Sequence, residues 1–423
     1  MKVAKFIALV IVFVCSIARA DIIEVPDFRA DQDPIPNSLA GVASSLTYNY
    51  SVIFYRTPLP SPAEGDLFAR RFDLDGNPLG NAFRVDSAPV SAGSDGSGVI
   101  IDSNGNMVFC FADTRSGQIR IYFNRFDLNE NQITVDTEVV SAIGGRIASL
   151  PSGGFVIVYD RGDIYARIYD STGSPIGGEF QVNQSGSDID FPQVATSTTG
   201  QIYIAWTFGS PGTAVYARLF DSSGNPLDNE FRVDQSTEGV YSRTIAAAPN
   251  GNFIVGWKDK REGGSFGPDV AYGRVFDSSG NPITDDLKLL QNTPVGQPTG
   301  TPSATSDPSG RFIIVCSDSQ VVEGAGIYMR RIDSFGQFMG VESRIDSGNS
   351  NGTPYAAPVG SMRIFTAWPD QRVVSGEIWA NIVGPEPSIV PFASNTVLVI
   401  LALLLLATLI FSLKRRNMAG SER

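Results

Sequence analysis

VYARLFDSSGNPLDNEFRVDQ, the stretch from Val215 to Gln235, is the clearest copy of a pattern that recurs along this chain. Polar and apolar residues alternate in YARLF and in EFRVD, so each segment predicts a strand whose successive side chains point to opposite faces. Asp221, Gly224 and Pro226 lie between them. They predict a tight turn, because Asp hydrogen-bonds the backbone ahead of it, Gly adopts a positive φ and Pro cannot continue a ladder. The stretch therefore predicts a β-hairpin.

Copies of this hairpin repeat from the mature N-terminus almost to the C-terminal apolar run. Clear copies begin at Ala69, Ala166 and Gly273, and weaker ones at Arg125 and Arg330. More apolar segments lie upstream of the hairpins, at 50–55, 107–111, 155–159, 202–206, 253–257, 312–316 and 362–368. Each unit thus holds four strands in about fifty residues, which is typical of a propeller blade. The sequence predicts an all-β fold, a seven-bladed β-propeller with four-stranded blades.

The two ends of the repeat region are incomplete in complementary ways. Residues 25–32 match the fourth strand at 229–235, but the other three strands of a repeat do not precede them. The last repeat stops at Gly384 and Pro385 without a fourth strand. We therefore predict that the N-terminal strand completes the last blade and closes the ring, which removes exposed sheet edges. The alternative is one decayed repeat at each end.

Both termini carry apolar segments that predict export and a membrane anchor. Residues 1–20 have the layout of a secretory signal, with early lysines, an apolar core and Ala18-Arg19-Ala20 before the cleavage point. Near the other end, 397–413 is almost long enough to span a bilayer as a helix, and basic residues follow it. A buried core helix is the alternative there. The predicted organisation is a signal peptide (1–20), a propeller (21–384), a Pro-bearing linker (385–396), a transmembrane helix (397–413) and a cytoplasmic tail (414–423).

The C-terminal segment also resembles a family of bacterial sorting signals. Val390, Pro391 and Ser394, the apolar run and the membrane stop at Lys414, Arg415 and Arg416 are similar to the IPTL-type relative of the PEP-CTERM class in Gram-negative bacteria. The resemblance implies export, processing by an exosortase-like membrane protease, and surface display or release. Val390 replaces the usual Ile and the usual Trp is missing, so a plain membrane anchor is the alternative. The repeats resemble bacterial extracellular repeats of the W-x-D-x-R … YARxFDxxGxP kind.

Candidate binding residues lie where the second strand of a repeat ends. The motif W-x-D-x-R occurs twice, and related forms occur in two other repeats. Its charged residues and their relatives are Asp113, Arg115, Asp160, Asp259, Arg261, Asp370 and Arg372. The loops that follow are irregular and share one face of the predicted disc, so these residues are candidates for a polar rim that binds a glycan or peptide. The structural alternative is an ion pair at the strand end over a core Trp.

Other repeated residues favour structural roles. An Arg in the third strand and an Asp at the turn recur in five or six repeats, whereas a catalytic group is needed once. The segment 73–77, DLDGN, is similar to a calcium loop but lacks the Glu at the twelfth position, and the matching turns read DSSGN. We expect a hairpin turn there and no cofactor, with bound calcium as the alternative.

The amino-acid composition disfavours some kinds of catalytic site, metal site and binding partner. The chain has no His, which removes the commonest general base and the commonest zinc ligand but leaves carboxylate chemistry possible. Residues 21–396 hold 25 basic and 43 acidic residues, a net charge of −18 that disfavours nucleic acid and anionic lipid as partners. Cys15 lies in the predicted signal. Cys110 and Cys316 fall on blades that are not neighbours, which predicts two buried free thiols.

These patterns predict a protein of the cell envelope, exported with its propeller outside and held by one helix. The leading function is non-enzymatic recognition or adhesion, with an unknown glycan or protein as ligand. One alternative is a carboxylate-dependent glycan hydrolase or lyase with its site in the propeller mouth. Another is a structural component of an extracellular matrix.

Overall fold

The computed structural model describes residues 21–32, 38–58, 64–87, 90–91, 97–114, 116–184, 186, 189–209, 214–262, 268–292, 299–318, 325–348, 350, 352–370 and 376–385. The chain divides into two compact units, 1–384 and 385–423, and the first contains the propeller. Within these described ranges we found no helix with the length and apolarity needed to cross a bilayer. The predicted signal peptide, sorting motif, membrane helix and basic tail lie outside the described residues, as do Arg115 and Arg372.

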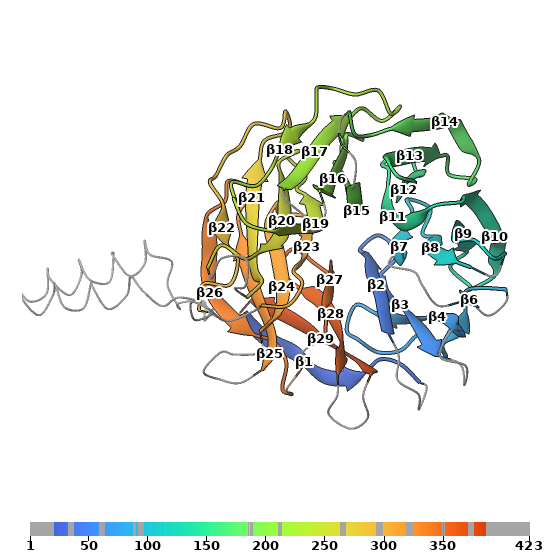
Figure 1. Cartoon of the computed structure of the whole chain (residues 1–423). Helices are drawn as coiled ribbons and strands as arrows, with labels where there is room; N and C mark the ends of the chain where they lie inside the picture. The colour runs from blue at the N-terminus through green and yellow to red at the C-terminus, as the bar shows by residue number, and fades with distance from the viewer. Residues whose placement is uncertain are drawn as a thin grey trace, which may run out of the picture. The chain divides into compact units, whose positions relative to one another are not determined.

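Seven sheets surround a central axis in the part of the chain that the structure describes (Figure 1). Blade 1 contains β2 (Ser38–Ser45), β3 (Tyr50–Pro58), β4 (Glu64–Asp73) and β5 (Phe83–Arg84), with β6 (Val90–Ser91) also paired to β4. Blade 2 contains β7 (Ser97–Ile101), β8 (Met107–Asp113), β9 (Arg120–Phe126) and β10 (Gln132–Val140). Blade 3 contains β11 (Ile143–Ser149), β12 (Phe155–Asp160), β13 (Ile164–Tyr169) and β14 (Pro175–Gln181). The first strand of each blade is the innermost.

The remaining four blades repeat this order. Blade 4 contains β15 (Ile189–Thr196), β16 (Ile202–Phe208), β17 (Ala214–Phe220) and β18 (Phe231–Arg232). Blade 5 contains β19 (Val240–Ala247), β20 (Phe253–Asp259), β21 (Val270–Phe276) and β22 (Leu287–Lys288). Blade 6 contains β23 (Ser303–Ser306), β24 (Phe312–Asp318), β25 (Gly326–Ile332) and β26 (Phe338–Arg344). Blade 7 contains β27 (Tyr355–Pro358), β28 (Ile364–Asp370), β29 (Glu377–Pro385) and the N-terminal β1 (Asp21–Arg29). The seven-bladed, four-stranded architecture is therefore confirmed.

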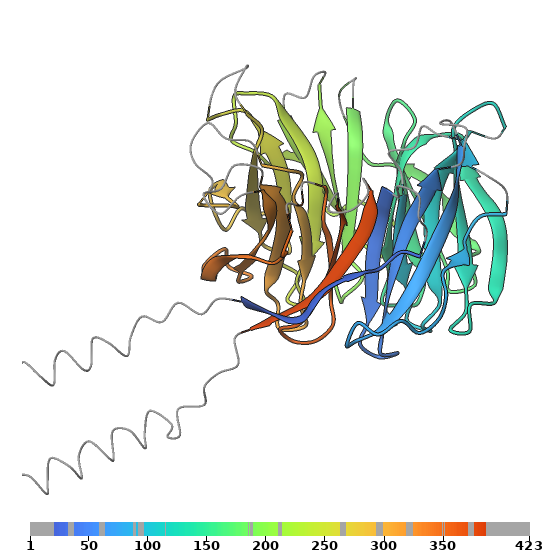
Figure 2. The same ribbon diagram turned by 90° about the horizontal axis from the view of Figure 1, so that it is seen from below.

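The ring closes through β1, as the incomplete repeats predicted. Strand β1 is the outermost strand of blade 7, beside β29. The backbone N–H of Ala30 donates to the carbonyl of Ile378 at 2.7 Å, and the N–H of Ile378 donates to the Asp31 carboxylate at 3.0 Å. Figure 2 shows the first and last strands of the propeller lying together. The N-terminal segment is thus a fourth strand, and the alternative of two decayed repeats is wrong.

Apolar side chains fill the space between neighbouring blades. The second strands β8, β12 and β24 are buried along their whole length. Their side chains alternate between the two adjoining cores. In β8, Phe109 packs toward Phe54 of blade 1, with ring centroids 5.1 Å apart, whereas Val108 and Cys110 pack toward blade 3. Full burial of such a side chain stabilises the fold by about 1.5–3 kcal/mol. Cys110 and Cys316 are both buried free thiols, as predicted.

In blades 1, 4 and 5, the repeated third-strand Arg connects its blade to the segment that precedes it around the ring. Arg218 in blade 4 donates to the carbonyl of Val182 in blade 3 at 2.9 Å. Arg274 in blade 5 donates likewise to Val233 at 3.1 Å. Arg70 in blade 1 donates to Ala30 at 3.0 Å, and Ala30 directly follows the closing strand β1. These bonds satisfy buried carbonyls between blades, so Arg70, Arg218 and Arg274 have the structural role that the sequence predicts.

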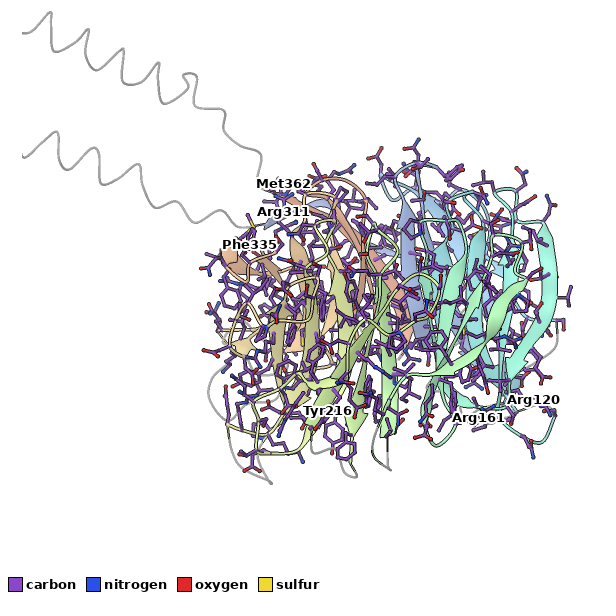
Figure 3. All side chains as sticks on the ribbon, turned by 90° about the horizontal axis from the view of Figure 1, so that it is seen from above. Arg120, Arg161, Tyr216, Arg311, Phe335 and Met362 are labelled. Carbon is purple, nitrogen blue, oxygen red and sulfur yellow. The ribbon has the colours of Figure 1, made fainter. Side chains whose placement is uncertain are left out.

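Two faces of the propeller differ in their connections. We call the face that carries the loops between second and third strands, together with the links between blades, the loop face. The opposite face, which carries the hairpin turns, is the turn face. In Figure 3, Arg120, Arg161 and Tyr216 lie at the loop face. Arg311, Phe335 and Met362 lie at the turn face in the same view.

Both ends of the propeller lie at the turn face. Arg363, in the turn that precedes β28, donates to the Glu24 carboxylate of β1 at 2.6 Å. The same guanidinium donates to Asp75 in the hairpin turn of blade 1 at 3.0 Å. A Cβ on Gly384, near the end of β29, would also meet the Glu24 side chain. Strand β1 therefore begins, and β29 ends, on the face opposite the irregular loops.

Candidate functional site

The predicted site carboxylates end the second strands of four different blades. Asp113, Asp160, Asp259 and Asp370 close β8, β12, β20 and β28, and each is at most 5% exposed. Their positions at the loop-face ends of the strands agree with the sequence analysis. The structure does not gather them into one cluster, because each belongs to its own blade. Their binding role stays a prediction, and their surroundings decide what each can do.

Asp259 is enclosed by donors from its own blade. Its carboxylate accepts from the indole N–H of Trp257 at 3.0 Å, and the Arg261 guanidinium forms an ion pair with it at 2.6 Å. Arg261 also pairs with Asp286 at 2.7 Å and lies 4.1 Å from the ring centroid of Tyr272. This is the arrangement of an ion pair over a core Trp, and it holds the blade 5 edge together.

Asp370 repeats part of this arrangement in blade 7. Its carboxylate accepts from the indole N–H of Trp368 at 3.1 Å and from the Ser350 hydroxyl at 2.8 Å. The side chain is 0% exposed. Because one oxygen of this buried carboxylate, Oδ2, accepts from both donors, Asp370 anchors the end of β28.

Asp160 lies beside a surface hollow between blades 2 and 3. It lines this hollow of about 460 Å³ together with Arg161 and Gln118. Burial raises the pKa of Asp160, and the neighbouring Asp190 and Asp163 raise it further, although the N–H of Gly162 donates to its carboxylate at 2.8 Å. Of the predicted carboxylates described here, Asp160 is the one with a raised pKa beside a hollow.

Arg161 is held away from Asp160 by other partners. Its guanidinium donates to Glu179 at 2.6 Å and lies 4.6 Å from the ring centroid of Tyr165. Glu179 also accepts from the Tyr159 hydroxyl at 2.8 Å. The cation at this hollow is therefore part of a network on the outer half of blade 3.

A larger cavity lies on the propeller axis, and the sequence analysis did not identify it. Its volume is about 610 Å³, and the innermost strands of all seven blades line it. One wall is apolar and made of small and branched residues: Leu39, Ala40, Gly41, Val42, Gly98 and Val99. The rest of the lining is mixed. Its polar residues are Arg146, Gln193, Thr244, Thr301, Ser303, Thr353 and Tyr355, and its apolar residues are Ile147, Phe191, Val194, Ile245, Pro302 and Ala304. Arg146 carries the only charge among the described residues of this lining.

The cavity occupies the part of the axis nearest the loop face. Each innermost strand starts at a blade link on the loop face and runs toward the turn face. The lining residues lie in the early or middle part of these strands, such as 39–42 in β2 and 191–194 in β15. The irregular loops therefore surround the approach to the cavity.

Phe191 is a conformational outlier in this lining. Its φ is +55°, a left-handed backbone conformation that costs a bulky residue about 1–3 kcal/mol. It lies in a β-bulge of β15, where the pairing jumps from Asp190↔Thr207 to Gln193↔Ala205. Blade 3 has the same bulge between Ile143 and Arg146.

The equivalent bulge in blade 3 shows what the backbone alone requires. Gly144 occupies the position of Phe191 there, with a φ of +66°, and glycine adopts this conformation without the cost that a side chain adds. Sequence alone could not reveal this equivalence, because the two innermost strands share little pattern and the register shift appears only in the paired sheet. The fold therefore tolerates Gly at this position, yet blade 4 holds an aromatic ring beside the cavity.

No site for a metal is evident in the described ranges. We found no group of three or more Asp, Glu, Cys or His side chains there that could hold an ion. In the DLDGN turn, the Asp73 carboxylate accepts from the N–H groups of Asp75 and Asn77 at 2.9 and 2.8 Å, and from the Asn77 side chain. These contacts are those of a hairpin turn.

Comparisons with known proteins agree on the fold. No family model matches the chain, and no curated protein matches it in sequence. Among solved structures, a protein of unknown function from Dyadobacter fermentans is 12% identical, with a TM-score of 0.53 over 86% of this chain and 99% of that one. The polysaccharide lyase Uly1 is 8% identical, with a TM-score of 0.54 over 84% and 91%. The WD40 domain of Neurospora crassa Pan2 is 12% identical, with a TM-score of 0.50 over 88% and 98%. At these identities the likeness concerns the propeller fold alone.

Proposed function

We propose that this protein is an exported recognition module that binds its ligand in the axial cavity, from the loop face. The observation that carries the proposal is the cavity itself, which combines apolar and polar lining residues and includes two aromatic residues, Phe191 and Tyr355. Its volume falls within the range of small-molecule sites, about 300–1,000 Å³. Sites of this kind combine an apolar surface with a few polar groups that fix orientation.

The position of the chain ends supports the same proposal. Strand β1 begins and β29 ends on the turn face, so neither described end of the propeller lies at the loop face, where the cavity opens. The buried carboxylates Asp259 and Asp370 would then support the rim by fixing strand ends.

A carboxylate-dependent glycan hydrolase or lyase is the second candidate. The hollow beside Asp160 favours it, because a carboxyl group with a raised pKa can act as a general acid. One carboxyl group is insufficient for the usual paired mechanism. Asp163 and Asp190, whose charges influence Asp160, are the nearest candidates for a second group.

A single experiment separates the two candidates. The full chain, solubilised in detergent, is applied to a glycan array and a peptide array, and both retained protein and released sugar are measured. Retention without release supports the recognition module. Release of sugar that Asp160→Asn abolishes would support the enzyme instead. Failure to bind any glycan or peptide would refute the recognition proposal.

A further inference from the structure

We infer that Arg56 binds an Asp or Glu side chain of a peptide partner, at the loop-face end of blade 1 and outside the axial cavity. This inference rests on the proposed recognition function and names the chemistry of the partner. It starts from a cation that has no partner among the described residues of the propeller. The equivalent cation in blade 5 has one, and the comparison indicates which group is missing in blade 1.

Arg56 is part-buried and has no internal partner. It lies on β3, two residues before that strand ends at the loop face. Its guanidinium forms no hydrogen bond or ion pair with the residues that the structure describes, and its Nε is buried without an acceptor. Burial lowers the pKa of Arg56, because the charged form loses hydration. A buried donor without an acceptor destabilises the free protein, and an acceptor from a ligand would remove that cost.

Lys258 occupies the equivalent position in blade 5 and is paired. Arg56 pairs with Leu67 across the sheet as Lys258 pairs with Ala271. In both blades this third-strand residue accepts the backbone N–H of the residue that follows the fourth strand. The ammonium of Lys258 forms an ion pair with the Asp269 carboxylate at 3.2 Å. Blade 5 therefore shows a cation at this position together with its counter-ion.

Gly65 takes the place of Asp269 in blade 1. Each of the two lies two residues before the third-strand partner of the cation. A Cβ on Gly65 would lie 2.7 Å from Nε and 3.1 Å from Cγ of Arg56, so the arginine side chain passes directly over this glycine. The position that supplies a carboxylate in blade 5 thus supplies none in blade 1. The carboxylate for Arg56 then comes from a partner.

Asp269 also indicates the class of partner. A guanidinium presents a planar fork of N–H donors that matches a carboxylate. Because an Asp side chain of this chain fills the position in blade 5, an Asp or Glu side chain of a peptide suits the same position in blade 1. The net charge of −18 for residues 21–396 disfavours polyanions. We therefore expect a peptide with one acidic residue among neutral or basic ones.

The test compares peptides that differ in one carboxylate. An array of short peptides, each made with Asp and with Asn at its centre, is probed with the full chain in detergent, and the retained peptides are titrated by calorimetry. The wild type should bind at least one Asp peptide about tenfold more tightly than its Asn counterpart. Arg56→Gln should remove this preference. Arg56→Lys should restore part of it, since an ammonium keeps the charge but lacks the planar fork.

Lys258→Gln is the matched control for the binding measurement. Lys258 already has a carboxylate partner in Asp269, so its replacement should leave the preference for Asp unchanged. Melting temperatures separate binding from a structural role. Arg56→Gln removes a part-buried charge that has no partner, so this variant should melt at or above the wild-type temperature. A clear fall in melting temperature with an unchanged preference for Asp would show that Arg56 is structural and would overturn the inference.

The remaining outcomes distinguish this inference from the function on which it rests. Peptide binding without a preference for Asp over Asn, or a preference that survives Arg56→Gln, would overturn the inference and leave the recognition function in place. Retention of acidic glycans alone, even if Arg56→Gln abolishes it, would overturn the peptide as the partner. No binding to any glycan or peptide would overturn both the inference and the recognition function.

Discussion

Replacing Asp31 by Ala should weaken the seam that closes the ring. Asp31 follows β1, is 3% exposed, and accepts the N–H of Ile378 at 3.0 Å and the Arg29 guanidinium at 2.6 Å. Loss of the acceptor leaves a buried backbone N–H unpaired, which costs about 1–3 kcal/mol. The ion pair with Arg29, whose side chain is 34% exposed, adds at most about 1 kcal/mol. The expected loss of unfolding free energy is therefore about 1–4 kcal/mol.

Equivalent residues in other blades provide matched controls. Asp234 follows the fourth strand of blade 4 and accepts the N–H of Val215 at 2.6 Å, so Asp234→Ala should cost a similar amount. In blade 3, Asn183 accepts the N–H of Ile164 at 2.8 Å in the same way. Asp31→Asn should therefore keep the backbone hydrogen bond and lose less than Asp31→Ala.

Thermal unfolding of the full chain, followed by circular dichroism, is a suitable assay. For a propeller of this size, the expected loss lowers the melting temperature by roughly 1–5 °C. An unchanged melting temperature for Asp31→Ala, together with a clear decrease for Asp234→Ala, would refute the reasoning. That result would mean that β1 does not complete blade 7 in solution.

Three further predictions concern buried and turn residues. Asp259→Ala should lower the free energy of unfolding by about 2–4 kcal/mol in urea titrations, because Trp257 and Arg261 lose their buried partner. A loss of ligand binding with no loss of stability would instead assign Asp259 to the binding site. Burial raises the pKa of Cys110 and of Cys316 to about 12. The contribution of these neutral thiols to the free energy of unfolding is therefore fully present below the unfolded-state pKa of about 9, and it is lost as the pH rises toward 12. Native protein should therefore leave both thiols unlabelled by DTNB at pH 8, as judged by mass spectrometry, and early labelling would contradict their burial. The Asn225 side chain and the backbone N–H groups of the turn lower the pKa of Asp221, so its stabilising effect is present above about pH 4 and is lost as the pH falls through the folded-state pKa. Asp221→Ala should show a smaller loss of melting temperature between pH 5 and about pH 2 than the wild type, and an equal loss would contradict this account.

The hairpin repeat made most of the architecture predictable. Turn residues such as Asp221 and Gly224 act locally, so the sequence alone indicates their conformation, and recurrence of the turn indicates the blade. The strand boundaries were less certain. The sequence predicts one strand over 362–368, but β28 begins at Ile364. Met362 belongs to the preceding turn, where its carbonyl accepts from Arg331 at 2.8 Å.

The candidate site was harder to predict because it depends on contacts between distant segments. The motif W-x-D-x-R correctly indicated where Asp259 and Asp370 lie, at strand ends on the loop face. Their donors include Ser350, which lies twenty residues before Asp370 and carries no motif. The axial cavity combines one to four residues from each of seven strands, and no single strand shows it. Phe191 stands out only when its bulge is aligned with that of Gly144.

Closure through β1 also has a consequence for the order of folding. Asp31 and Ile378, which meet at the seam, are 347 residues apart, so β1 can dock only after β29, the last strand of the propeller, has been synthesised. Joining ends that far apart in an unfolded chain costs about 3 kcal/mol more in entropy than closing a ten-residue hairpin. We expect the blades to form first from local hairpins and β1 to dock afterwards. Until it docks, β29 has an open edge that can pair with another chain, which makes the nascent protein most vulnerable to aggregation just before the ring is complete.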